Sequence, residues 1–142
     1  MEQYRYALTK KSPVTTPIEL KVEATVNPSE SRERVIAAVT NVIECSPEFR
    51  YGSRVIGRSI GIESLRTIYE QVRSRSAMGV LRRMLLNNRV ADSTYFLLNK
   101  QAAATGIAVV IDDEQESPLG PIRVTLDCEE LDVLIDWLVP VD

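Results

Sequence analysis

Arginines in the middle of the chain are the residues whose type and spacing most suggest chemistry. The candidate phosphate contacts are Arg50, Arg54, Arg58, Arg73, Arg75, Arg82 and Arg83. The first three share parity, so a regular strand would present them on one face, unless Gly52 or Gly57 marks a bulge. A guanidinium binds phosphate through a planar fork, and Tyr51 could stack a base. The segment 48–90 is therefore a candidate RNA-binding segment.

An alternative use of these arginines is internal ion pairing. Segment 48–90 holds nine basic and three acidic groups, whereas residues 91–142 hold two basic and eleven acidic groups. The whole chain has a net charge of −3 and a pI near 5.1, while RNA-binding domains are usually basic. Pairing with Asp132, Asp136 or the loop 112–116 is therefore the simpler explanation of the arginines.

A second candidate site is the tripeptide Asn99, Lys100 and Gln101. It lies where an apolar strand ends and a short helix is predicted, and a helix N-terminus together with a lysine can hold an anion. Capping of that helix by Asn99 is the simpler alternative. Trp137, near the end of an amphipathic helix, is expected to be a core or interface anchor.

Catalytic and metal-binding arrangements are scarce in this sequence. The chain has no histidine, which removes Ser-His and Cys-His activation and most zinc sites. Two cysteines, Cys45 and Cys128, cannot form a four-thiolate site, and we expect free thiols in a reducing cytosol. The acidic stretch 112–116 lacks the ligand spacing and glycine of a calcium loop. We therefore expect no catalytic residue, metal or cofactor.

The hydrophobic pattern predicts alternating strands and amphipathic helices. Strands are expected at 19–26, 48–60 (one or two short ones), 94–100, 107–111 and 122–126. One helix is expected to begin at an Asn27 cap, with Glu30 completing a capping box. Further helices are expected at 63–73, 77–88, 100–106 and 129–138. This order predicts an α+β fold with two layers, a largely antiparallel sheet with helices packed on one face.

The predicted domain organisation is simple. Residues 1–17 show no period and are expected to form a flexible N-terminal arm, followed by a single α+β domain at 18–142. No apolar run approaches the roughly 20 residues of a membrane helix, and the start lacks the apolar stretch of a secretory signal. We therefore expect a cytoplasmic protein without a membrane partner.

Several segments resemble the archaea-specific uncharacterised protein family 201. They are LLNKQAA (97–103) with Gly106, SPLGPIRVTL (117–126), LDVLIDWLVP (131–140) and ATVNPSES (24–31). The resemblance covers residues 19–140 in the same order and leaves out the arm at 1–17. It implies a fold similar to the ribosomal protein that binds 5S ribosomal RNA, and it implies a homodimer. It brings no catalytic residues with it.

Three hypotheses follow from these observations. The preferred one is a non-enzymatic, homodimeric archaeal interaction protein, working in an RNA-associated assembly. The alternative is direct RNA binding through 48–90, and the second alternative is an enzyme using paired carboxylates or Lys100. Arginines that are clustered and open would favour RNA, whereas arginines paired with carboxylates would favour protein contact.

Overall fold

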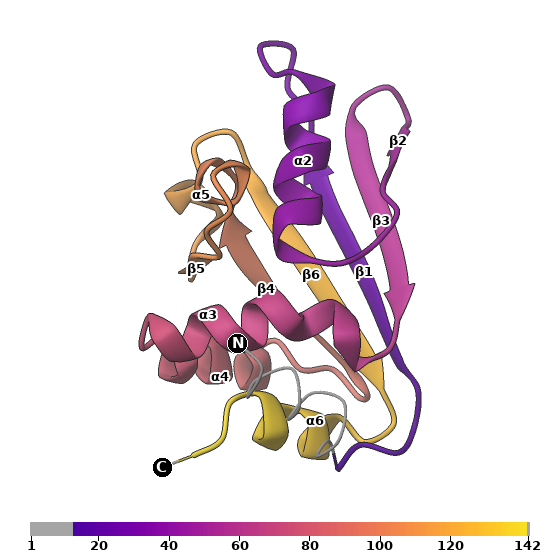
Figure 1. Ribbon diagram of the computed structural model, residues 1–142, viewed down its shortest axis with the longest axis vertical. Helices are drawn as coiled ribbons and strands as arrows, with labels where there is room; N and C mark the ends of the chain where they lie inside the picture. Colours follow the sequence, from indigo (N-terminus) through magenta and orange to yellow (C-terminus); the bar gives the residue numbers. More distant parts are fainter. Residues whose placement is uncertain (1–12, 142) are drawn as a thin grey trace.

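Six antiparallel strands form one sheet in the order β2-β3-β1-β6-β4-β5. A computed structural model describes residues 13–141 of the chain, and Figure 1 shows its arrangement. The strands are β1 (Ile18–Thr25), β2 (Glu48–Arg50), β3 (Arg54–Ile60), β4 (Ser93–Asn99), β5 (Val110–Ile111) and β6 (Pro121–Cys128). The long strands β1 and β6 lie side by side at the centre, and the short β2 and β5 form the edges.

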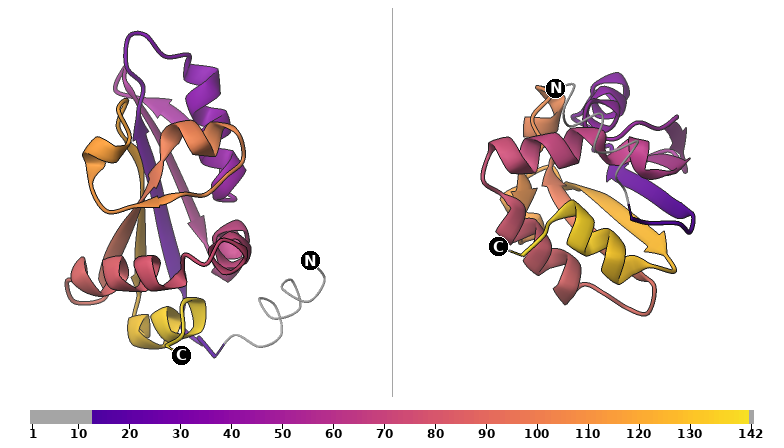
Figure 2. Two further views of the ribbon diagram at one scale, coloured as in Figure 1. Left: turned by 90° about the vertical axis from the view of Figure 1, so that its left-hand side faces the viewer. Right: turned by 60° about the horizontal axis from the view of Figure 1, so that its bottom comes forward.

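The helices pack on one face and across one end of this sheet (Figure 2), so the predicted α+β fold is confirmed. They are α2 (Arg32–Val42), α3 (Arg66–Ser74), α4 (Met78–Asn87), α5 (Lys100–Ala104) and α6 (Leu131–Leu138), with 3-10 turns η1 (Ile62–Leu65) and η2 (Glu114–Glu116). The edge-on view in Figure 2 places α2, α3 and α5 on the same side of the strands. In that view η2 and its flanking loop lie against the opposite side.

Strand alternation creates two chemically different faces. Leu20, Val22 and Ala24 of β1 are buried against the helices, and alternate residues of β6 such as Val124 are buried beside them. The residues between them point to the opposite side, which we call the open face. On the four long strands the open face consists of Glu19, Lys21, Glu23, Thr25, Arg54, Ile56, Arg58, Ile60, Ser93, Tyr95, Leu97, Asn99, Pro121, Arg123, Thr125 and Asp127.

The C-terminal helix α6 is anchored through an aromatic stack. Trp137 stacks on Tyr69 of α3 with ring centroids 4.8 Å apart, and the Arg73 guanidinium lies 3.5 Å from the centre of the Tyr69 ring. Leu134 and Leu138 of α6 are fully buried in the same core. Trp137 therefore has the anchoring position expected from the sequence.

Two predicted boundaries were wrong for identifiable reasons. Helix α2 begins at Arg32 with Ser31 as its N-cap, not at Asn27, because Glu30 accepts the Asn27 N–H at 3.0 Å within a preceding turn. The strand predicted at 107–111 is reduced to Val110–Ile111. The N–H groups of residues 107 and 108 are used elsewhere, since they donate to the Ala102 carbonyl and the Gln71 side chain.

The segment 48–60 forms a hairpin without a bulge inside β3. Tyr51 and Gly52 make the turn with positive φ angles of 58° and 73°. Gly57 lies opposite Val22 in an unbroken register. A Cβ at Gly57 would lie 2.6 Å from the Cys45 Sγ, so the glycine lets that thiol pack directly on the strand. The shared parity of Arg54 and Arg58 is therefore preserved.

Residues at the start of the described chain are bound to the turn before α6. Thr15 and Thr16 donate their N–H groups to Glu130 Oε1 at 2.6 and 2.8 Å. These bonds hold the pKa of Glu130 below its usual value, with the Thr15 N–H as the largest cause. They belong to the predicted arm 1–17, of which residues 1–12 lie outside the described part.

Two further findings bear on the sequence-based expectations. Cys45 and Cys128 are free, and burial raises the pKa of the Cys45 thiol. Between residues 13 and 141, the helices are too short or too polar to cross a bilayer.

Candidate functional site

The seven candidate arginines are divided between two sides of the molecule. Arg50, Arg54 and Arg58 lie on the β2–β3 hairpin, with Arg54 and Arg58 on the open face and Arg50 directly opposite Arg54. The other four are placed by α3 and α4, in the helical layer: Arg73, Arg75, Arg82 and Arg83. The structure therefore does not bring the seven together into one site.

Most of the helical arginines hold the C-terminal third of the chain in place. Arg82 donates to the Val139 carbonyl at 2.9 Å and forms an ion pair with Asp136 at 2.9 Å. Arg83 pairs with Asp112 at 3.2 Å. Arg73 donates to the Tyr69 and Trp137 carbonyls. These contacts are the internal pairing that the acidic C-terminal third suggested, whereas the side chain of Arg75 makes no ion pair within residues 13–141.

The hairpin arginines are less fully neutralised. Arg50 forms an ion pair with Glu48 at 2.6 Å, and this carboxylate raises the pKa of Arg50. Arg54 forms an ion pair with Glu23 of the neighbouring strand β1. The side chain of Arg58 is exposed and has no hydrogen bond or ion pair to any described residue.

Arg58 belongs to a row of side chains that crosses four strands of the open face. The register places Arg58 opposite Lys21, Lys21 opposite Thr125 and Thr125 opposite Tyr95. We call these four residues the cationic row. The Lys21 ammonium forms a long ion pair with Glu23 Oε2, at 3.8 Å. Like charges directly opposite each other destabilise a sheet, so this row keeps two cations adjacent against their repulsion.

The surface is hollowed on both sides of Arg58. One hollow, of about 400 Å³, is lined by Arg58 and Lys21 together with Ile60 and Asp127. The other, of about 250 Å³, is lined by Arg58, Arg50 and Tyr51. Tyr51 is 80% exposed. Two concave surfaces therefore share one unpaired guanidinium.

The sequence reasoning did not single out three residues of the open face. Lys21, Tyr95 and Arg123 come from three different strands, and the Arg123 guanidinium lies 3.8 Å from the centre of the Tyr95 ring. Outward positions were readable for Lys21 and Arg123 from strand alternation. Their proximity was not readable, because it depends on which strands pair.

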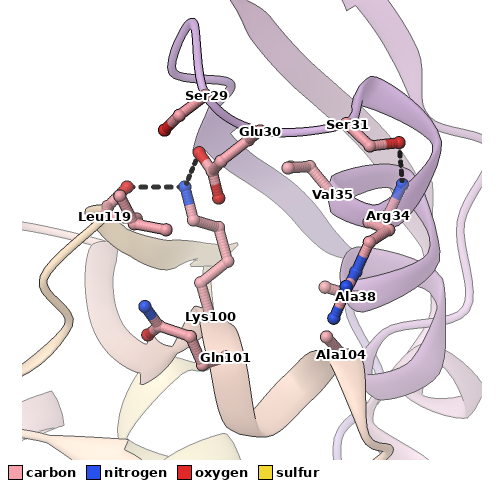
Figure 3. A pocket seen from close by; sticks show the side chains of 10 residues that line it. All are labelled: Ser29, Glu30, Ser31, Arg34, Val35, Ala38, Lys100, Gln101, Ala104 and Leu119. Atoms are coloured by element: carbon pink, nitrogen blue, oxygen red, sulfur yellow. Dashed lines mark hydrogen bonds and ion pairs between the residues drawn. The ribbon is translucent and has the colours of Figure 1, made fainter.

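Two residues of the tripeptide at the start of α5, Lys100 and Gln101, line a separate pocket of about 250 Å³ between α2, α5 and Leu119. Figure 3 shows Lys100 extending from α5 toward Glu30 and Leu119. The Lys100 ammonium donates to the Thr25 carbonyl at 2.7 Å, to Glu30 Oε1 at 2.9 Å and to the Leu119 carbonyl at 2.6 Å. An ammonium has three N–H donors, so all of them are used within the protein.

The neighbours of Lys100 have equally defined roles. Asn99 caps α5 by accepting the Ala102 N–H at 2.8 Å, which is the simpler of the two predicted alternatives. Gln101 is exposed at the pocket. Burial alone would raise the pKa of Glu30, but hydrogen bonds from Lys100 and Asn27 hold it below its usual value. The pocket is therefore lined by a charged, internally satisfied ion pair.

The described residues contain no group of three or more metal-ligating side chains. The open face carries groups that could bind a ligand. It offers unpaired cations, a planar guanidinium–aromatic pair and two hollows. These groups suit recognition of phosphate and planar rings.

Comparison with known proteins gives a consistent family. A family model described as RNA binding matches residues 19–128. A UPF0201 protein of Sulfurisphaera tokodaii is 35% identical over 123 residues, covering 84% of this chain and 85% of the relative. That of Sulfolobus acidocaldarius is 37% identical with the same coverage. The solved UPF0201 protein from Methanococcus jannaschii has a TM-score of 0.72 at 25% identity, covering 87% of this chain and 94% of that one.

Proposed function

Because the chain belongs to the archaeal UPF0201 family and matches a model described as RNA binding, we propose that it is a non-enzymatic protein that contacts RNA through the open face. The observation that carries the proposal is the directly opposed pair Arg58 and Lys21. A second opposed pair, Arg50 and Arg54, lies at the hairpin end of the same surface. Three of these four cations have a carboxylate partner in the free protein, Glu48 for Arg50 and Glu23 for Arg54 and Lys21, so Arg58 is the cation that a bound anion would neutralise.

The phosphodiester backbone is the anion that this arrangement fits. A phosphate between Arg58 and Lys21 would remove their mutual repulsion, and the arginine fork can hold two phosphate oxygens at once. The opposed cations are spread along the face, as a chain of phosphates requires. The proposal therefore concerns Arg50, Arg54, Arg58 and Lys21, and it assigns the helical arginines Arg73, Arg82 and Arg83 to holding the fold.

Direct RNA binding was the alternative among the sequence-based hypotheses. The paired helical arginines by themselves favour protein contact, and we place RNA first because the matching family model is described as RNA binding and Arg58 stays open. Arg82 and Arg83 pair with carboxylates of the C-terminal third, which removes them as phosphate contacts. The same pairing neutralises Asp136 and Asp112, two of the eleven acidic groups in residues 91–142. Arg58, by contrast, stays exposed and unpaired among the described residues.

The test is fluorescence anisotropy with an RNA hairpin carrying a single-stranded loop, at about 50 mM salt, where phosphate contacts are strongest. Arg58→Gln and Lys21→Gln should each weaken binding several-fold. Arg83→Gln removes the same charge from α4 and is the matched control, which should bind like the wild type. Arg58→Gln should also raise the free energy of unfolding by about 0.2–1 kcal/mol, because the repulsion between Arg58 and Lys21 is gone. Urea unfolding measures this change.

Two results would contradict the proposal. Wild-type protein that binds no RNA at low salt would remove it. Equal weakening by Arg58→Gln and Arg83→Gln would mean that a charge on the open face contributes no more to RNA affinity than a charge on α4.

Homodimer formation is a second candidate, favoured by the charge pattern of the same face. Next to the cationic row lie the carboxylates of Glu19 and Asp127, which are directly opposite each other. Ile60 lies opposite Glu19 on β3 and is 77% exposed. If a twofold axis ran between the cationic row and the neighbouring row of Glu19 and Asp127, the cations of one copy would face the carboxylates of the other. Light scattering after size exclusion should then give twice the chain mass at micromolar concentration, and a monomer would contradict this candidate.

The remaining parts of the proposal concern the compartment and the absence of catalysis. Free thiols at Cys45 and Cys128 support a reducing compartment, the cytoplasm. The complete use of the Lys100 ammonium by Thr25, Glu30 and Leu119 supports a structural role for that lysine over a catalytic one.

A further inference from the structure

Arg123 occupies an unusual position on the open face. Glu23 lies directly opposite it, but Glu23 pairs with Arg54 and Lys21 instead. The Arg123 guanidinium lies against the Tyr95 ring, 3.8 Å from its centre, and within residues 13–141 it has no ion pair or hydrogen bond. An arginine held by a ring keeps its N–H donors and its second face available.

A small hollow lies beside this guanidinium. It has a volume of about 160 Å³ and is lined by Arg123, Arg54, Glu23, Thr25 and Glu114. Glu114 belongs to η2, which Figure 2 shows on the open side of the sheet. Its side chain is exposed, and its carboxylate has no partner among the residues described. The hollow thus combines a planar cation with an unpaired acceptor.

These two groups match the two surfaces of a nucleobase. Guanidinium planes stack on bases in RNA recognition, and carboxylates accept hydrogen bonds from the exocyclic amino group of cytosine. Uracil has a carbonyl oxygen at the equivalent position, which a carboxylate would repel. The hollow should therefore prefer cytosine over uracil.

The cationic row lies within reach of the same nucleotide. Lys21 is two residues from Glu23 along β1, which corresponds to about 7 Å. Arg58 lies directly opposite Lys21. A base in the hollow would place its flanking phosphates near these two cations. A base paired in a duplex could not enter the hollow, because it is stacked between its neighbours and its ring faces are covered.

We propose that the open face binds single-stranded RNA, with one base stacked on Arg123 beside Glu114 and the flanking phosphates on Lys21 and Arg58. This inference rests on the proposed RNA-contacting function and specifies its substrate. It predicts that strand state and base identity both affect affinity.

The experiment uses fluorescein-labelled oligo-C and oligo-U RNAs of about ten nucleotides, and a duplex of the same length, at about 50 mM salt. Oligo-C should bind about tenfold more tightly than oligo-U, and the duplex should bind more weakly than oligo-C. Glu114→Gln should bring oligo-C and oligo-U to nearly equal affinity. Arg123→Lys keeps the charge but removes the plane, so oligo-C affinity should fall about tenfold.

Arg83→Lys on α4 is the matched control for Arg123→Lys and should change nothing. Thermal unfolding of each variant establishes that it is folded before binding is compared. If Arg123→Lys binds like the wild type, or the duplex binds as tightly as oligo-C, the base site is wrong while RNA contact through Arg58 stands. If no RNA binds the wild type, the proposed function fails together with this inference.

Discussion

Lys100 shows what a single buried charge does in this fold. Its side chain is 3% exposed and its ammonium joins the end of β1, the turn before α2 and the loop before β6. An ion pair of this kind is not a strong source of stability in itself, because removing both charges from water is costly. Removing one partner, however, leaves the other charge buried without compensation.

We expect Lys100→Met to destabilise the protein by about 3–5 kcal/mol, because Glu30 would lose its counter-charge and two carbonyls would lose their donor. Urea unfolding measures this change. The double variant Lys100→Met, Glu30→Gln should lose less than the single variant. If the single variant were as stable as the wild type, Lys100 would not be the structural residue described above.

The stability of the protein should also depend on pH through Glu30. Folding lowers the pKa of Glu30 despite its burial, because Lys100 and Asn27 donate hydrogen bonds to the carboxylate. The unfolded chain therefore binds this proton more readily than the folded protein does. The contribution is complete above the ordinary pKa of 4.5 and is lost as pH falls through the lower folded value.

Urea midpoints measured between neutral pH and about pH 3 check this prediction. The wild type should lose stability below about pH 4.5, and Glu30→Gln should show a shallower decline. Part of the decline will remain in that variant, because the pKa of Glu130 is also lowered. A variant whose decline matched that of the wild type would mean that Glu30 does not contribute.

Residue roles were predictable where the relevant partner is close in sequence. Asn99 capping α5 could be predicted because the N–H it accepts is only three residues away. The partners of Lys100 could not, because Thr25 and Glu30 lie 75 and 70 residues away and meet it only through the tertiary fold. The same limit explains why Arg123 and Tyr95 were not recognised as a pair.

At the level of elements, β3 is shaped by a close contact with the segment after α2. Gly57 stands in the middle of the strand where a side chain would meet the Cys45 Sγ at 2.6 Å. From the sequence, a bulge at this glycine was left open. Its actual role is to make room, which could not be predicted because Cys45 is brought there by α2.

Gly57→Ala should therefore destabilise the protein by about 1–3 kcal/mol through overpacking. Cys45→Ala removes the sulfur, so the added methyl group should cost much less in that background. Chemical denaturation of the four proteins in a double-mutant cycle gives the coupling between the sites. Additive effects would show that the thiol is not what excludes a side chain at position 57.

At the scale of the whole molecule, opposite charges are separated in sequence and partly rejoined in space. The basic helices and the acidic C-terminal third neutralise each other through Arg82–Asp136, Arg83–Asp112 and Arg89–Asp132. The β-rich part retains its unpaired cations on the open face. A chain with a net charge of −3 can therefore present a local surface suited to an anion.

This distribution predicts a shallow salt dependence for RNA binding. Each phosphate contact on a single strand contributes a slope of about −0.7 to a plot of log affinity against log salt. With two to four contacts from Lys21, Arg58 and their neighbours, we expect a total slope of about −1.4 to −2.8. Binding titrations at several salt concentrations measure this slope. Arg58→Gln removes about one phosphate contact, so its slope should be shallower by about 0.7. A much steeper slope would require cations beyond the open face and would return the helical arginines to the binding surface.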